Sequence, residues 1–302
     1  MAERIGDRER IVQGLCDRSI AQLQVGDVRG AAADLDAASR IAHELRQPAQ
    51  LWLVCGAQAM LALAAGRLDE GEELVPQALA LGERAQPAAA IAVYGLQRYT
   101  LCDFRGGLEE LVPAICDLVA GYPARPVFRC VLAHLHGRLG QLPEAKRALD
   151  ELAPDAFSAL PFDQEWLYGM SLLAETSALL GDTDSATVLY GLLLPWAAFN
   201  AVDQAEGMRG SLSRYLGLLA ATTERWEDAE LHFEDALAMN ASMGARPWLA
   251  QTQEDYARLL LRRDGPGDRR RGEGLFDLAL GTYRSLGMQS YAAKASAATS
   301  TR

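Results

Sequence analysis

The side chains that could do chemistry are few in this sequence, and none has the spacing of a catalytic or metal-binding motif. His134 and His136 lie two residues apart, so on a helix they diverge and cannot hold one zinc ion as an i, i+4 pair does. No Ser or Cys has a His and a carboxylate at motif spacing, and no G-x-x-x-x-G-K-S/T phosphate loop is present. We therefore expect no catalysis, no cofactor and no metal site, with an enzyme as the remote alternative.

A second group of polar residues is better suited to binding. Glu175 and Arg214 are candidate anchors for a ligand, because each can form charge-assisted hydrogen bonds. His134, Tyr168 and Ser171 are the neighbouring candidates. The alternative for Glu175 and Arg214 is an internal salt bridge between neighbouring helices. Glu175, Arg214, His134 and Ser171 occupy recurring positions in a repeated helical pattern, and Tyr168 lies nearby.

That pattern recurs roughly every 40 residues, as in helical repeat proteins. A turn residue, usually Gly, is followed at positions +5, +9 and +12 by apolar or small residues. Steps of four and three keep these residues on one face of an α-helix, where they can pack against a neighbouring unit. The turn residues of the seven units are Gly26, Gly66, Gly106, Gly140, Gly181, Glu224 and Gly267.

Each unit also has a helical run before its turn residue, so the units are helix pairs that must stack to bury their apolar faces. The sequence predicts an all-α fold, a right-handed superhelical solenoid of about seven tetratricopeptide-like (TPR-like) helix pairs in one domain, residues 1–302. From Met288 onward we expect a tail without a partner helix. The expected pairs span residues 8–46, 49–86, 88–121, 126–153, 162–199, 205–243 and 246–287, followed by the tail at 288–302.

Composition and charge narrow the partners and the location. The 302-residue chain carries a formal net charge of −11, which disfavours direct binding to nucleic acid. The five cysteines form no CxxC pair and are expected to be small buried thiols in a reducing compartment. Residues 47–66 and 185–202 carry no charge, but both fall in register with the repeat, so we expect buried helices rather than membrane spans. The N-terminal segment has no secretory signal, and a cytoplasmic location is expected.

The run GSLSRYLGLLAATTERWEDAELHFEDALAMNASMGARPWLAQTQEDYARLLLRRDGPGD resembles the C-terminal TPR-type region of large bacterial signalling ATPases. In that family a cyclase domain or a LuxR-type DNA-binding domain accompanies an AAA/STAND ATPase and this helical array. LPFDQEWLYGMSLLAETSALLGD resembles the middle of the same region. The resemblance implies a sensor or scaffold arm that regulates an attached ATPase and an output domain.

The resemblance also implies that the first helix of each pair lines a concave groove. Positions ten, six and three before the turn residue then face the groove. In the first unit these positions hold Cys16, Ile20 and Leu23, whereas Glu175 and Arg214 occupy them later, so the lining changes from apolar to polar along the chain.

We therefore expect a non-catalytic interaction and sensing module that regulates a signalling ATPase with a transcriptional or cyclase output. Its groove would bind a peptide or a partner domain, including the ATPase or output domains of the same polypeptide. The alternative is a small-molecule inducer sensor that uses the same groove. In either case ligand binding would favour one curvature of the array.

Overall fold

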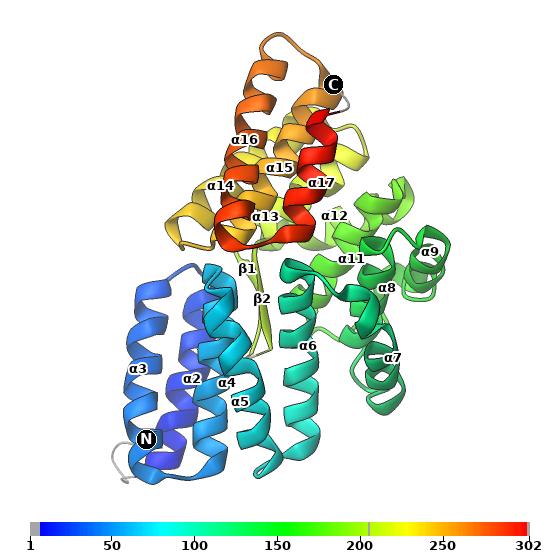
Figure 1. Ribbon diagram of the computed structural model, residues 1–302. Coiled ribbons are helices and arrows are strands. Elements are labelled where there is room, and N and C mark those ends of the chain that lie inside the picture. The colour runs from blue at the N-terminus through cyan, green and yellow to red at the C-terminus, as the bar shows by residue number, and fades with distance from the viewer. Residues whose placement is uncertain (1–6, 205, 301–302) are drawn as a thin grey trace.

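The chain is almost entirely helical in the computed structural model, which describes residues 7–204 and 206–300 (Figure 1). Within these residues there are sixteen α-helices, two short 3₁₀ helices and one two-stranded antiparallel sheet. The all-α class predicted from composition and periodicity is confirmed at this level. Helices that follow one another along the chain pack together, as α2 does with α3, α4 with α5, and α15 with α16.

The N-terminal part of the molecule consists of six α-helices and one 3₁₀ helix. The α4 helix is apolar around its whole circumference, because α2, α3, α5, α6, α15 and the sheet surround it. These elements are α2 (Arg8–Gln24), α3 (Val28–Leu45), α4 (Pro48–Ala65), α5 (Leu68–Glu83), α6 (Pro87–Arg105), η1 (Leu108–Leu111) and α7 (Val112–Gly121).

The C-terminal part holds the remaining ten helices, a 3₁₀ turn and the two strands. Its large buried cluster joins α8, α11 and α13 with the helices that flank them. These elements are α8 (Val127–Arg138), α9 (Leu142–Asp150), α10 (Pro154–Phe157), α11 (Trp166–Leu180), α12 (Thr183–Leu193), η2 (Leu194–Trp196), β1 (Asn200–Asp203), β2 (Gly207–Ser211), α13 (Leu212–Thr222), α14 (Trp226–Ser242), α15 (Arg246–Arg263), α16 (Asp268–Leu286) and α17 (Gln289–Ser300).

The repeated sequence offsets have a clear structural role. Gly66 and Gly181 end their helices in the left-handed conformation, with φ of 79° and 65°. Glu224, which replaces Gly in the sixth unit, takes the same region with φ of 59°. At +5 after a turn residue, Ala31 and Ala229 are fully buried, and small side chains there leave room for close packing. The offsets therefore mark helix ends and packed helix faces.

A β-hairpin interrupts the helical order. The periodicity predicts that a helix pair begins at residue 205, but β1 and β2 pair here instead, with Val202 opposite Met208, and α13 begins only at Leu212. In Figure 1 the hairpin lies at the centre of the molecule, between the N-terminal and C-terminal helices. It contacts α2, α4, α6, α11, α13, α14 and α15, so it links parts of the chain that are distant in sequence.

The C-terminal segment is not the partnerless tail that we expected from the sequence. It forms α17, which packs against both α16 and α6 (Figure 1). Tyr291 is buried, and its hydroxyl donates to Asp103 Oδ2 on α6 at 2.7 Å. The periodicity missed this contact because α17 packs across the molecule onto α6.

Two further expectations concern α4 and the cysteines. By length and composition α4 could cross a membrane, but 61% of its apolar window is buried inside the protein, as expected for a core helix. All five cysteines are free thiols, and Cys16, Cys55 and Cys130 are buried as expected. Cys116 is instead exposed on α7, because it points away from the face that carries Ile115 and Leu118 into the core.

Candidate functional site

The five candidate residues come together in the centre of the C-terminal half. They lie on three successive inner helices: His134 on α8, three residues on α11, and Arg214 on α13. None is freely exposed. The exposed fractions are 0% for His134, Tyr168 and Ser171, 3% for Arg214 and 5% for Glu175.

The β1–β2 hairpin of the same chain covers these residues. Arg209 on β2 is 3% exposed, and its guanidinium donates to Glu175 Oε2 at 2.7 Å and to Ser171 Oγ at 3.0 Å. It also lies over the rings of Tyr168 and Trp248, at 5.9 and 5.4 Å, where a cation is attracted to the aromatic face. An arginine from the same chain therefore occupies the polar part of the predicted groove.

Glu175 is the acceptor at the centre of this cluster. Besides Arg209, it accepts from Arg214 Nη1 at 3.2 Å, and His134 Nε2 lies 3.5 Å from it. Burial alone would raise the pKa of Glu175, but the Arg214 guanidinium, with His134 and Arg209, holds it well below its usual range. Glu175 and Arg214 thus form the internal salt bridge that was the alternative to a ligand contact.

His134 serves as a neutral partner in this cluster. Its Nδ1 lies 2.5 Å from the Tyr99 hydroxyl, and burial lowers its pKa despite the nearby Glu175 carboxylate. A neutral imidazole is suited to hydrogen bonding between two helices. His136 belongs to a different environment, with Nδ1 2.6 Å from Gln141 Oε1, so the two histidines diverge as their spacing predicts.

Arg214 extends the network to α15. Its Nε donates to Asp255 Oδ2 at 2.7 Å. Burial raises the pKa of Asp255 to about 6, and the Arg214 guanidinium opposes this rise only in part. Asp255 therefore titrates near pH 6, whereas Glu175 stays ionised.

Beside this network lies a cavity of about 310 Å³, which we call the central pocket. Helices α8, α11, α13, α15 and α17 all contribute to its wall. The acidic lining residues are Glu175, Glu254 and Asp255. The basic ones, which outnumber them by one, are Arg138, Arg214, Arg258 and Lys294.

Two groups in the central pocket have unused binding capacity. Lys294 Nζ donates to the carbonyl of Arg138 at 3.2 Å, and across residues 7–204 and 206–300 no carboxylate forms an ion pair with it. Burial and the Arg138 guanidinium lower the pKa of Lys294, so a bound anion would be stabilising there. Gln251 Oε1 is buried without a hydrogen-bond partner among the described residues. Neither residue had the helix spacing used to select candidates from the sequence.

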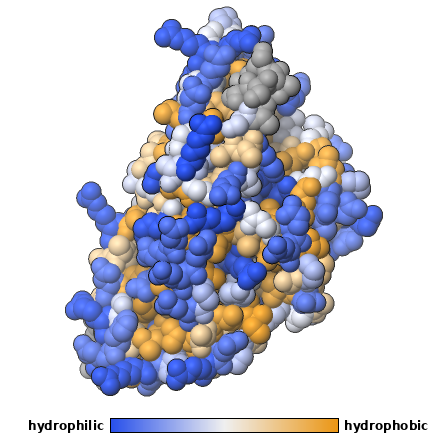
Figure 2. All heavy atoms as spheres, viewed as in Figure 1, coloured by the Kyte–Doolittle hydropathy of each residue, from blue (hydrophilic) through white to orange (hydrophobic). Residues whose placement is uncertain are grey.

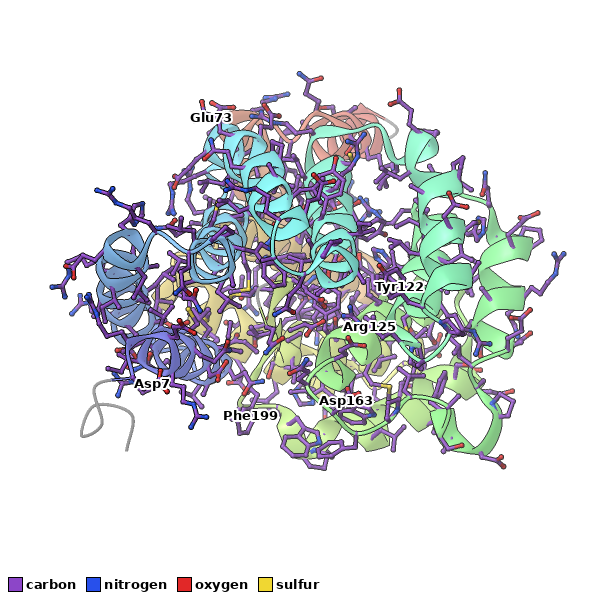
Figure 3. The ribbon with its side chains drawn as sticks, turned by 90° about the horizontal axis from the view of Figure 1, so that it is seen from below. Asp7, Glu73, Tyr122, Arg125, Asp163 and Phe199 are labelled. Atoms are coloured by element: carbon purple, nitrogen blue, oxygen red, sulfur yellow. The ribbon has the colours of Figure 1, made fainter. Side chains whose placement is uncertain are left out.

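A second cavity, the N-terminal groove, opens between α2, α4, α6 and the turn of the hairpin. It has a volume of about 630 Å³ and adjoins a small pocket that includes Cys16 and Ile20, together with Trp52 and Leu53 from α4. Figure 3 shows Arg125 and Asp163, which line this groove, toward the middle of the molecule. Its polar lining is rich in amides, namely Gln13, Gln50, Gln86, Gln164 and Gln204.

Arg209 is the central residue that sequence reasoning missed. The periodicity assigned Arg209 to the helix pair expected at 205–243, so nothing placed it next to Glu175. The available signal was the pair Gly207 and Gly210, which break a helix and flank the arginine.

The comparisons with known proteins assign no family to this chain. No protein-family model matches the chain, and no similar sequence is found among the curated proteins.

Proposed function

We propose that this chain is a non-catalytic sensing module whose central pocket binds a small effector that carries an acidic group. The observation that carries this proposal is the excess of basic over acidic side chains in a cavity of about 310 Å³, a volume within the range of small-molecule sites. Lys294 and the exposed end of Arg258 would bind the acidic group. Gln251 Oε1 would accept a hydrogen bond from a donor on the same ligand.

The position of the pocket supports a sensing role. Its wall combines α8 and α11 with α15 and α17, which lie far along the chain. An effector that contacts Lys294 on α17 and Arg258 on α15 would favour the arrangement in which these helices are closest. Ligand binding would then shift the population of arrangements toward that one.

The array that this mechanism needs is part of the proposal. We infer a right-handed solenoid of about seven TPR-like pairs, closed by α17 packing on α6. Through the resemblance of its sequence, it would regulate a signalling ATPase and a transcriptional or cyclase output in the cytoplasm of a bacterium. The consecutive packing of α2 with α3, α4 with α5 and α13 with α14 supports the paired architecture.

A peptide or partner domain is the second candidate ligand, and the N-terminal groove favours it. This groove remains open, and it combines the apolar side chains of Ile20, Trp52 and Leu53 with glutamine amides, which can bind a peptide backbone. On the face drawn in Figure 2, hydrophilic side chains dominate and hydrophobic ones gather in several small areas. That face thus offers no single broad apolar patch for a partner.

Lys146 provides a matched control for the effector, because Lys146 and Lys294 are the only lysines. Lys146 lies on α9, outside the central pocket, and pairs with Asp150 and Asp182. We would measure thermal unfolding with succinate, citrate and inorganic phosphate, and native mass spectra of freshly purified protein. At least one anion should stabilise wild type and Lys146→Met, and Lys294→Met should weaken its binding about tenfold or more.

Two results would count against the central pocket. Equal anion binding by Lys294→Met and Lys146→Met would place the anion elsewhere. A captured peptide whose binding is lost in Trp52→Ala and retained in Lys294→Met would instead support the N-terminal groove as the functional site.

A further inference from the structure

Three carboxylates converge at the turn of the hairpin. Glu165 comes from the residue before α11, Asp203 ends β1, and Glu206 lies in the turn that leads to β2. One oxygen from each lies within 4.8 Å of the others. Nothing in the sequence spacing of these residues indicated that they would meet.

Asp203 is the observation that points beyond an ordinary acidic surface. It is 0% exposed, and neither of its carboxylate oxygens has a hydrogen-bond partner among the described residues. A carboxylate that is buried without a partner is strongly unfavourable unless it gains a counter-charge or a proton. The side chain is directed at the oxygens of Glu165 and Glu206, so whatever neutralises it must be shared with them.

The protein provides one counter-charge here, Arg125. Its guanidinium contacts Glu165 and donates to both oxygens of Glu206, at 2.7 and 2.6 Å. The described ion pairs include none between Arg125 and Asp203. Three carboxylates and one guanidinium leave a formal charge of −2 when all are ionised, which one divalent cation would balance.

We infer that Glu165, Asp203 and Glu206 bind a hard divalent cation of the size of Ca²⁺, which joins the turn of the hairpin to the start of α11. Two Ca²⁺ ligands on opposite sides of the ion, each at about 2.4 Å, lie about 4.8 Å apart. Oxygens that all lie within 4.8 Å of one another can therefore share one ion of this size. A set of oxygen ligands without His or Cys selects a hard cation over zinc or copper.

The N-terminal groove supplies access and further ligands. Glu165, Glu206 and Gln204 also line this groove, so water can reach the ion and complete its coordination. The cation would fix the hairpin turn, while Arg209 fixes the middle of β2. This inference does not depend on an effector in the central pocket, because Lys294 and the cluster line different cavities.

A direct test uses Tb³⁺ as a luminescent substitute for Ca²⁺. Trp166 directly follows Glu165 in the chain and would sensitise the luminescence of a bound Tb³⁺ ion. With chelator-treated full-length protein, we expect Tb³⁺ luminescence that Ca²⁺ abolishes and that Trp166→Phe reduces. Mg²⁺ should compete less well, because it requires shorter distances and octahedral geometry.

Variants of the ligands give the second measurement. In calorimetric titrations, Asp203→Asn and Glu165→Gln should each weaken Ca²⁺ binding at least about tenfold. Glu73→Gln should bind as wild type does, since Glu73 is exposed and lies at the edge of the molecule, away from Arg125, in Figure 3. Circular dichroism would verify that each variant is folded.

Two outcomes would overturn the inference. One is that neither Ca²⁺ nor Tb³⁺ binds to wild type, which would show that the cluster holds a proton. Burial and the Glu206 carboxylate raise the pKa of Asp203 well above its usual range, so a proton is the expected occupant without a cation. The other is Ca²⁺ binding that is equal in wild type, Asp203→Asn and Glu165→Gln, which would place the ion elsewhere.

Discussion

Two positions in the hairpin hold buried charges in opposite situations. In the middle of β2, the Arg209 guanidinium is matched by Glu175, Ser171 and aromatic rings. At the turn, the Asp203 carboxylate is equally buried but has no hydrogen-bond partner among residues 7–204 and 206–300. One short element of nine strand residues therefore carries both a satisfied and an unsatisfied buried charge.

The difference separates structural residues from ligand-binding residues. Charges that satisfy one another hold helices together, and a ligand could use them only by replacing an existing partner. A charge that lacks a partner gains most from something outside the chain. By this criterion Glu175 and Arg209 are structural, whereas Asp203 and Lys294, which forms no ion pair among the described residues, have the most to gain from a ligand.

The largest effect is expected at Arg209, the buried charge that has partners. Arg209→Met should lower the free energy of unfolding by about 3–5 kcal/mol, because it removes one partner of a buried ion pair. The measurement is urea denaturation monitored by circular dichroism. Arg269→Met is the control, since the Arg269 side chain is 71% exposed and its ion pair is with Glu273 in the same helix. A loss below about 1 kcal/mol would show that Arg209 does not hold the hairpin in place.

A smaller effect is expected from Gly210→Ala. Gly210 has a φ of 70°, and a Cβ there would lie 2.7 Å from Asn240 Oδ1 and 2.8 Å from Trp248 Cβ. Overpacking of this kind costs about 1–3 kcal/mol. Gly191→Ala on α12 is the control, because a Cβ there meets nothing within 4 Å. If both variants unfold at the same denaturant concentration, the hairpin does not pack on Trp248 as described.

The sequence allowed the helices and part of the site to be predicted, for a local reason. Helix periodicity fixes which side chains share a face, so Glu175 and Arg214 could be assigned to neighbouring inner helices from their spacing alone. Arg209 and Asp203 could not, because the periodicity assigned Arg209 to a helix and left Asp203 between two helix pairs. The conformation of residues 200–211 depends on contacts with α2, α4, α11 and α15, which lie far away in sequence.

A third prediction concerns the tie between the hairpin and the N-terminal helices. Asn200 is fully buried, and its Nδ2 donates to the carbonyl of Leu23 on α2 at 3.0 Å. Asn200→Ala should cost about 0.5–1.5 kcal/mol, the net value of a typical hydrogen bond. Hydrogen exchange should also increase at the C-terminal end of α2. Faster exchange in α13 instead of α2 would mean that Asn200 stabilises only its own half.

The smallest effect is a pH dependence at Asp255, a buried carboxylate that has a partner but is only partly stabilised by it. Its carboxylate is paired with Arg214, yet burial raises its pKa to about 6 from the ordinary value of 3.8. Between these values the folded protein binds a proton that the unfolded chain does not. Asp255 therefore favours folding most at low pH, and this contribution is lost as pH rises from about 4 to about 6.

Comparison with Asp255→Asn isolates that contribution, because all other carboxylates titrate in both proteins. As pH falls from about 7 to about 4.5, the unfolding free energy of wild type should rise relative to that of the variant. Parallel curves would mean that Asp255 titrates as it does in the unfolded chain. Protonation would also leave Glu175 and Glu254 as the remaining carboxylates of the central pocket. An acidic effector should thus bind more tightly to wild type below pH 6 than above it, a change absent from Asp255→Asn.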